Sequence, residues 1–445
     1  MTAAGTVSRV QTAPSWLRYS GAIEELSIEA RRALFARATN TSDSLAAETA
    51  RIVSDVRARG DLALLEMARR FDSVDLAALE VPRTMLARAL DETPASLRRA
   101  MERAARNIAT VHSAFMPSAV EVESESGIIV GRRPDPLRRV GVYAPGGRAS
   151  YPSSVLMGAI PARVAGVGEI VLCSPPDRTG VPSSAVLAAA QLASVDRVFA
   201  VGGAGAIAAM ALGTETIPRV DRIVGPGNAY VAAAKLQLVG DVAIDSPAGP
   251  SELLIVADES ADANDVALEM VAQAEHDPNA CVLAIAVGDG LAGAIRRALA
   301  TAVAATPRRD IVALALAAQG GVLCADSVES GVDFANEYAP EHLLLAVRRP
   351  DAALSRVRNA GTVFLGAMSS VAFGDYMTGA NHVLPTGGAA RTYSGLSPLD
   401  FVRWTTYQRV DEEAARRLSD DVARFAEAEL LPGHAAAARR WSAAS

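Results

Sequence analysis

The chain has 445 residues, half of them hydrophobic and 21% charged, a globular balance that predicts about two to four domains. Its net charge of −7 gives no reason to expect a nucleic-acid partner. Lys235 is the only lysine, which excludes a Walker loop ending in Gly-Lys-Ser/Thr. We expect Lys235 at a solvated position of a helix.

The N-terminus and the cysteines indicate the cellular compartment of the protein. The opening stretch MTAAGTVSRVQTAPSW lacks the apolar core of a signal peptide, and no run of about 18 apolar residues could span a membrane. Cys173, Cys281 and Cys324 lie far apart beside strand-like apolar runs, so we expect buried, unpaired thiols. An odd number of thiols favours a reducing compartment, and we expect the protein to be cytoplasmic.

Helical patterns precede alternating ones along the chain. Residues 1–40 are weakly patterned, with one helical piece around IEARRALFARA. From 41 to about 115 the apolar residues recur three and four apart, which predicts helices, and the last of these carries His112, which we expect on the surface. From residue 127 strand-like runs alternate with alanine-rich segments in two sets, which predicts two parallel α/β units. From about residue 397 the pattern is helical again.

A glycine-rich turn follows the strand-like run RVFAVGG. Gly203, Gly205 and Ala208 approximate the GxGxxG/A fingerprint, in which backbone amides approach a pyrophosphate at a helix N-terminus. The acidic residue expected about 20 residues later is doubtful, since Asp221 lies at the start of its strand. Tight turns explain this stretch almost as well, and also YAPGGRASYP, GPGNAY and SPAGPSE.

A second group of residues has the chemistry of metal ligands. Gln273 and His276 lie three apart on a predicted helix and share one face. The loop GDYMTGANH adds Asp375 and His382, and LLPGH adds His434. Two histidines, a carboxylate and an amide oxygen suit zinc with room left for a substrate. The alternative is that these histidines cap helices or form simple hydrogen bonds.

A candidate acid–base pair occurs in YAPEHLLLAV. Glu341 and His342 are adjacent, after a proline and before a strand. Adjacent side chains diverge in direction, so both reach one small substrate only from a loop at the strand end. The alternative is a polar pair that starts a strand.

These blocks together resemble histidinol dehydrogenase. The stretches VGVYAPGG, YPSSVLM, VGGAGAIAAMALGTE, GPGNAYV, DSPAGPSE, QAEH, YAPEHL, GDYMTGANHVLPT and AEAELLPGH occur in the order found in that family, from about residue 40 to 440. The resemblance implies two successive oxidations of L-histidinol to L-histidine with NAD, the last step of histidine biosynthesis.

The resemblance also implies roles for individual residues. Glu341 and His342 would be the catalytic pair, with His342 taking the alcohol proton and Glu341 activating water. A neutral His342 with a pKa near the operating pH would suit that step. The zinc ligands would be Gln273, His276, Asp375 and His434. The substrate-binding set would be Ser251, Gln273, His276, His342, Asp375, His382, Glu429 and His434.

For NAD, the resemblance implies contacts from Tyr143 and Asn228. The family usually has Gln where this chain has Gly205, which removes a side-chain contact to the cofactor. We expect NAD affinity to survive through backbone contacts. The resemblance further implies a homodimer in which the C-terminal arm crosses, so that Glu429 and His434 complete the partner's site. An amphipathic segment at 397–445 is compatible with this arrangement.

The fold expected from pattern and resemblance together is α/β, with two incomplete Rossmann-like domains and helical N- and C-terminal arms. We expect an N-terminal helical arm at 1–40, a first α/β domain from 41–142 and 253–396, a second, nucleotide-side α/β domain at 143–252, and a C-terminal helical arm at 397–445. Two other functions stay open: oxidation of another small alcohol on the same scaffold, and a zinc hydrolase in which metal-bound water attacks a carbonyl.

Overall fold

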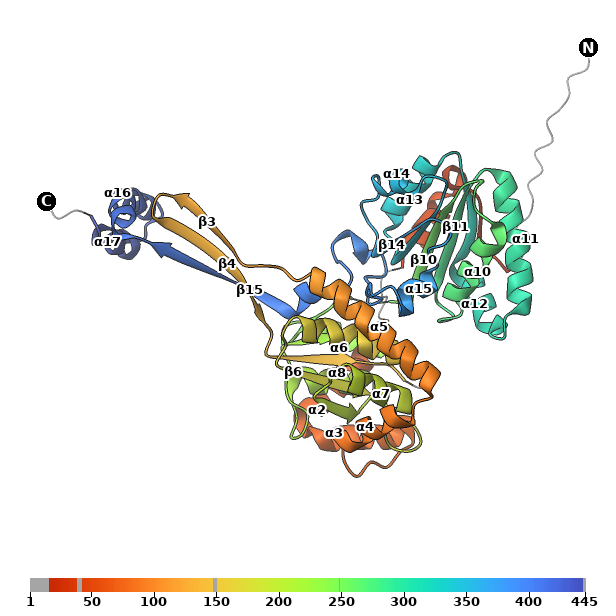
Figure 1. Ribbon diagram of the computed structural model, residues 1–445, viewed down its shortest axis with the longest axis horizontal. Coiled ribbons are helices and arrows are strands. Elements are labelled where there is room, and N and C mark those ends of the chain that lie inside the picture. The colour runs from red at the N-terminus through yellow and green to blue at the C-terminus, as the bar shows by residue number, and fades with distance from the viewer. Residues whose placement is uncertain (1–15, 38–41, 147–149, 248, 443–445) are drawn as a thin grey trace, which may run out of the picture.

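The computed structural model describes residues 16–37, 42–146, 150–247 and 249–442, which form two six-stranded sheets and one three-stranded sheet. Each six-stranded sheet belongs to a separate α/β body, and the three-stranded sheet extends away from both (Figure 1). The expected fold class is thereby confirmed.

The first six-stranded sheet, here called sheet A, is parallel throughout and has the order β1-β12-β11-β10-β13-β14. Its strands are β1 (Tyr19–Ala22), β10 (Glu252–Ala257), β11 (Cys281–Val287), β12 (Gly320–Ala325), β13 (His342–Ala346) and β14 (Thr362–Leu365). The central strands are continuous apolar runs because helices cover both faces.

The helices around sheet A form two cores. One core includes side chains of α10 (Ala263–Ala274), α11 (Asp289–Ala305), α12 (Arg309–Gln319) and α15 (Val371–Tyr376). The other includes side chains of α1 (Ile28–Phe35), α13 (Val328–Tyr338) and α14 (Pro350–Leu354). The N-terminal region therefore carries a strand as well as the expected helix, because β1 pairs with β12 at the edge of sheet A.

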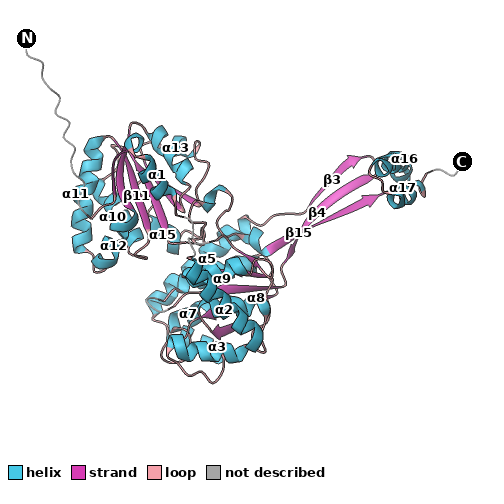
Figure 2. Cartoon of the chain, turned by 180° about the vertical axis from the view of Figure 1, so that it is seen from behind, coloured by secondary structure: helices cyan, strands magenta, loops and turns pink. Residues whose placement is uncertain are grey.

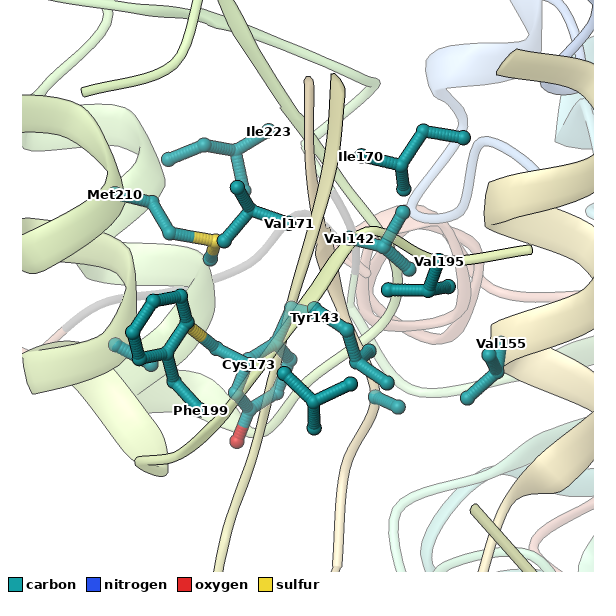
Figure 3. Close-up of a cluster of buried hydrophobic side chains, with 14 of the residues drawn as sticks. Val142, Tyr143, Val155, Ile170, Val171, Cys173, Val195, Phe199, Met210 and Ile223 are labelled. Atoms are coloured by element: carbon teal, nitrogen blue, oxygen red, sulfur yellow. The ribbon is translucent and has the colours of Figure 1, made fainter. Parts of the chain in front are cut away.

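The second six-stranded sheet, sheet B, has the order β2-β7-β6-β5-β8-β9. Its strands are β2 (Glu80–Val81), β5 (Arg139–Tyr143), β6 (Glu169–Ser174), β7 (Arg197–Ala200), β8 (Arg222–Val224) and β9 (Ala243–Ile244), and all pairs except β2 with β7 are parallel. Its helices are α6 (Pro152–Val164), α7 (Ser184–Leu192), α8 (Gly203–Leu212) and α9 (Ala229–Gln237). Figure 3 shows part of its core, where Tyr143, Cys173, Phe199 and Met210 meet.

Four helices in residues 43–114 belong to the same core. They are α2 (Asp43–Arg59), α3 (Asp61–Met67), α4 (Arg83–Glu92) and α5 (Ala95–Ala114), and their buried faces share one hydrophobic cluster with sheet B. The structure thus groups residues 43–114 with sheet B, whereas we expected them beside residues 253–396. The reason is physical: an amphipathic stripe fits either sheet, and the sequence does not specify which one it covers.

A long arm completes the molecule. It consists of β3 (Val120–Glu125), β4 (Ile128–Pro136), β15 (Val402–Val410), α16 (Glu412–Ala428) and α17 (Pro432–Arg439). The strands pair antiparallel in the order β15-β4-β3 and run outward from the sheet B body to the two helices at the tip (Figures 1 and 2). The C-terminal region expected to be helical therefore also contains a strand, β15, which pairs with β4 ahead of the two helices.

Two single-residue expectations were wrong. Lys235 is 2% exposed, and its ammonium donates to the carboxylate of Asp245 and to the carbonyl oxygen of Gly225, both at 2.6 Å. His112 is 1% exposed because it faces the core side of α5. The three cysteines are free and buried, as predicted.

Candidate active site

Glu341 and His342 lie where β13 begins. The strand starts at His342, after α13 ends at Tyr338 and the left-handed residue Ala339 turns the chain. Both side chains are almost fully buried. The pair therefore stands at the amino edge of sheet A, next to the start of β10.

The backbone of Glu252 holds both members of this pair. Its N–H donates to Oε2 of Glu341 at 2.7 Å, and its carbonyl oxygen lies 2.9 Å from Nδ1 of His342. A carbonyl only accepts, so Nδ1 carries the proton, and in the neutral ring Nε2 holds the free lone pair. Nε2 is buried without a hydrogen-bond partner among the described residues, as expected of a group that meets a substrate.

Carboxylates surround the imidazole of His342. Glu341 Oε2 lies 3.5 Å from Nδ1, and Asp375 Oδ1 lies 3.7 Å from Nε2. Burial lowers the pKa of His342, but Glu341, Asp375 and the carbonyl of Glu252 outweigh it and raise the pKa to about 9. That value exceeds the near-neutral one expected from the sequence, because the sequence does not reveal how many acidic groups converge on the ring.

His382 lies beside Asp375. Its Nδ1 donates to the backbone carbonyl of Asp375 at 3.0 Å, and its Nε2 lies 3.5 Å from the hydroxyl of Ser154 on α6. Burial lowers its pKa. Since α6 covers sheet B and Asp375 packs against sheet A, His382 stands where the two bodies meet.

Gln273 lies in the last turn of α10, and His276 follows just after the helix ends. Gln273 is buried and His276 is exposed. One turn earlier, Glu269 accepts from the N–H of Val371 at the start of α15, at 3.1 Å. Burial and, next, the carboxylates of Asp375 and Glu275 raise the pKa of Tyr376, so the end of α15 lies near the end of α10.

The other predicted ligand and substrate residues lie apart from this group. Glu429 and His434 are exposed and belong to the tip of the arm, whereas α10 and α15 lie beside sheet A (Figure 1). Ser251, just before β10, is half-buried at the same edge as Glu252. Within the described residues of one chain, no three His, Cys, Asp or Glu side chains form a cluster that could hold a metal ion.

The residues predicted to bind the nucleotide lie at the carboxyl edge of sheet B, whereas Glu341 and His342 lie at the amino edge of sheet A. Tyr143 ends β5, and its hydroxyl oxygen accepts from the N–H of Gly203 at the start of α8, at 3.0 Å. Burial raises the pKa of Tyr143 to about 12, so the hydroxyl keeps its own proton to donate. Asn228 follows β8 and caps α9, accepting from two backbone N–H groups at 3.1 and 3.2 Å.

This edge contains the point where the strand order of sheet B reverses. The chain passes from β5 to β6 and β7 on one side, then returns to β8 on the other side of β5. Ligands of open α/β sheets bind in the crevice at such a point. Tyr143, at the end of β5, and Asn228, which follows β8, flank this point.

The buried pair Lys235–Asp245 stabilises this edge and was missed by the sequence analysis. Lys235 holds the carbonyl of Gly225, and Asp245 accepts from the N–H of the same glycine at 2.8 Å. Gly225 has φ 115° and would place a Cβ 2.1 Å from the carbonyl oxygen of Tyr143. A lone lysine in an arginine-rich chain was the available signal, because only a compact ammonium fits between two close acceptors.

Gly205 lies inside α8 against α3. A Cβ there would meet Sδ of Met67 at 3.0 Å and Cδ2 of Leu64 at 3.2 Å. The space of a longer side chain is thus already occupied by the packing of α3.

Comparisons with known proteins agree over nearly the whole chain. The family model described as histidinol dehydrogenase matches residues 35–441. The histidinol dehydrogenase of Natronomonas pharaonis is 49% identical over 93% of this chain and 97% of its own length, and that of Methanosarcina mazei is 46% identical over 86% and 89%. The crystal structure of histidinol dehydrogenase from Elizabethkingia anophelis superposes with a TM-score of 0.91 at 34% identity, covering 96% of this chain and 98% of that one. No helix in the described part of the chain is long and apolar enough to cross a membrane.

Proposed function

The chain belongs to the histidinol dehydrogenase family, whose role is in histidine biosynthesis, and we propose that it oxidises L-histidinol to L-histidine in two steps with NAD and zinc. The single observation that carries the proposed mechanism is the position of Nε2 of His342, buried and unpartnered beside Asp375.

His342 is the proposed base for both oxidations. In the neutral ring, the form that predominates above its pKa of about 9, Nδ1 donates to Glu252 and Nε2 accepts the hydroxyl proton of the alcohol while a hydride leaves the carbinol carbon. The product of this first step is the aldehyde. Two electrons and two hydrogens have then left the substrate, one hydrogen as the proton on His342 and one as the hydride.

Glu341 is the proposed base for hydration. Its Oε2 already accepts from the N–H of Glu252, which leaves the other oxygen, Oε1, to take a proton from water as that water adds to the aldehyde carbon. As the water adds, protonated His342 returns its proton to the carbonyl oxygen, which completes the hydrate and frees Nε2. The hydrate then loses a second hydride from the same carbon, and Nε2 of His342 takes a hydroxyl proton again. The acid formed ionises to L-histidine.

Zinc is proposed at Gln273, His276, Asp375 and, from a second copy of the chain, His434. The donor types suit zinc, and the ends of α10 and α15 lie near each other, since Glu275 and Asp375 both act on Tyr376. When bound, zinc would hold the imidazole and amino group of the substrate. Ser251, His382 and Glu429 are the proposed remaining substrate contacts.

NAD is proposed at the carboxyl edge of sheet B. When bound, it accepts the hydride in each oxidation. Tyr143 has a hydroxyl proton to donate, and the N-termini of α8 and α9 favour the negative charge of a pyrophosphate. Asn228 is the second proposed contact.

A homodimer in the cytoplasm completes the proposal. The arm tip exposes large apolar side chains at Phe425 (71%), Leu430 (86%) and Trp441 (51%), which another protein surface would cover. Its Glu429 and His434 are remote from the other proposed ligands of the same chain. The free cysteines suit a reducing compartment.

The test is the yield of NADH per L-histidinol consumed, before and after chelation. We expect two NADH per substrate, lost on chelation and restored by zinc. One NADH with release of the aldehyde would contradict the role of Glu341. No NADH from metal-loaded protein would favour another small alcohol as substrate, and hydrolysis without NADH would favour the zinc hydrolase.

A further inference from the structure

A buried ion pair joins the N-terminal segment to the catalytic region. Arg37 Nη1 lies 2.5 Å from Oε2 of Glu252, and the two side chains are 2% and 1% exposed. Nη2 of Arg37 donates to the carbonyl oxygen of Tyr338, and the guanidinium stacks on the Tyr338 ring with its carbon 3.3 Å from the centroid. Arg37 therefore binds both the start of β10 and the end of α13.

Glu252 lies one residue before the start of the hydrogen-bonded ladder between β10 and β13. The first paired residues of that ladder are Leu253 and His342. The N–H and carbonyl of Glu252 on that side are taken instead by the side chains of Glu341 and His342. On this side, strand pairing alone does not fix the orientation of the peptide that holds the catalytic pair.

The side chain of Glu252 supplies the missing anchor. Its Oε1 accepts from the N–H of Gly387 at 2.8 Å, while Oε2 meets Arg37 and lies 3.4 Å from the N–H of Glu341. Glu252 and Glu341 thus exchange bonds, each carboxylate accepting from the backbone N–H of the other. Two carboxylates this close repel each other, and the guanidinium of Arg37 offsets that repulsion.

We propose that Arg37 and Glu252 are positioning residues for the catalytic pair. Arg37 fixes the carboxylate of Glu252, and the peptide of Glu252 then sets the position of the Glu341 carboxylate and the tautomer of His342. Their roles are to orient Glu341 and His342 and not to bind the substrate. The inference rests on the proposed function, since it assigns how the base at His342 is aimed.

The competing explanation is that the pair only stabilises the fold. Removing one partner of a buried pair leaves an unpaired charge and lowers the unfolding temperature whatever the function of the pair. The two explanations differ in kcat measured on folded protein. A positioning role lowers kcat and leaves KM unchanged, because reacting groups are displaced while binding contacts remain.

The experiment uses the full chain loaded with zinc. The variants are Arg37→Met, Arg37→Lys, Glu252→Gln and the double variant Arg37→Met/Glu252→Gln. Arg31→Met is the matched control, because Arg31 pairs with Glu337 and joins the same N-terminal segment to α13 at the surface without contacting Glu252. Kinetics are measured below the unfolding temperature of each variant, with L-histidinol and with the aldehyde as substrates.

We expect Arg37→Met to lower kcat by about 10- to 100-fold at unchanged KM for L-histidinol and NAD. Arg37→Lys should recover part of the loss, since it keeps the charge but not the fork that spans Glu252 and Tyr338. The double variant removes both charges, so its unfolding temperature should recover while its kcat stays low. Arg31→Met should have the wild-type kcat.

A folded Arg37→Met with wild-type kcat would overturn the inference, and so would a double variant whose kcat recovers together with its stability. An equal loss in Arg31→Met would also overturn it, because attachment of the N-terminal segment alone would then explain the effect. A wild-type protein that forms no NADH would overturn the proposed function itself, and the inference with it.

Discussion

Sheets A and B share one strand order but present their candidate sites at opposite edges. In each, the earliest strand in the chain, β1 or β2, lies at one edge. Among the five later strands, the second lies beside the first, the third beside the second, and the last two on the other side of the first. Tyr143 and Asn228 lie at the carboxyl edge of sheet B, where such folds bind nucleotides. Glu341 and His342 lie at the amino edge of sheet A. Two sheets of the same strand order thus carry their candidate residues at opposite edges.

Helix direction gives this difference a physical meaning. At the carboxyl edge of sheet B the helices α8 and α9 begin, and helix N-termini favour anions. At the amino edge of sheet A the helices α10 and α13 end, and helix C-termini favour cations. One edge thus suits a pyrophosphate, and the other suits a metal ion or a substrate amine.

The largest expected effect tests whether the proposed zinc site at the amino edge of sheet A is incomplete in a single chain. Deleting the residues after 426 should abolish zinc retention and activity, because Glu429 and His434 are lost, while NAD binding at sheet B should persist. Zinc content and NAD affinity are measured on the same preparation. A truncated protein with full zinc occupancy would contradict the shared site.

Mixing variants separates an arm that crosses from one that does not. The truncated chain keeps an intact catalytic pair, and a full-length His342→Asn chain keeps an intact arm. If the arm crosses, refolding the two together should create mixed dimers with one complete site and restore part of the activity. No restoration, with mixed dimers present, would mean that each arm serves its own chain.

The next effect tests the proposed nucleotide site at the carboxyl edge of sheet B. Lys235→Met should destabilise the protein by about 3–5 kcal/mol, since it leaves the carboxylate of Asp245 buried and unpaired. It should also raise KM for NAD, because the turn at Gly225 loses one of its two anchors. At saturating NAD the kcat should be unchanged, since the catalytic pair is on sheet A.

Urea unfolding and steady-state kinetics measure these two effects. Arg57→Met is the control, because its pair with Asp241 is exposed and should contribute less than about 1 kcal/mol. The double variant Lys235→Met/Asp245→Asn should recover most of the stability. If KM for NAD does not change in Lys235→Met, the buried pair of Lys235 and Asp245 does not contribute to NAD binding.

Much of this arrangement could be predicted from the sequence, and the remainder had identifiable causes. Alternation of strands and helices gave the fold class, and literal motifs pointed to Glu341 and His342. Arg37 and Glu252 escaped notice because their partners are distant in sequence and the contact exists only once sheet A has formed. The strand β15 was missed although VRWTTYQRV is rich in β-branched and aromatic residues, a composition typical of strands.

A smaller effect tests whether sheet B binds NAD through backbone contacts alone, with glycine at position 205. Gly205→Gln should destabilise the protein by about 1–3 kcal/mol through overpacking against Met67 and Leu64, without tightening NAD binding. Gly293→Ala in α11 is the control, because its Cβ meets nothing nearer than Arg297 Nη1 at 3.5 Å and should be neutral or stabilising. Strong tightening of NAD by Gly205→Gln would contradict backbone-only binding.

The smallest effect compares two buried histidines. His342 has carboxylates around it, whereas both ring nitrogens of His112 lack partners among the described residues, and burial lowers the pKa of His112 to about 4. Its stabilising contribution is complete above the unfolded pKa of about 6.5 and is lost as the pH falls toward 4. At pH 5.5 the loss should reach about 1.4 kcal/mol.

Replacing His112 by leucine isolates the contribution of His112 protonation to the unfolding free energy. The variant has no ring to protonate, so its unfolding free energy should fall less between pH 7.5 and 5.5 than that of the wild type, by about 1.4 kcal/mol. Urea unfolding at the two pH values measures the difference directly. Equal losses in both proteins would mean that the folded chain accommodates the imidazolium, through a partner that the packing of α5 does not provide.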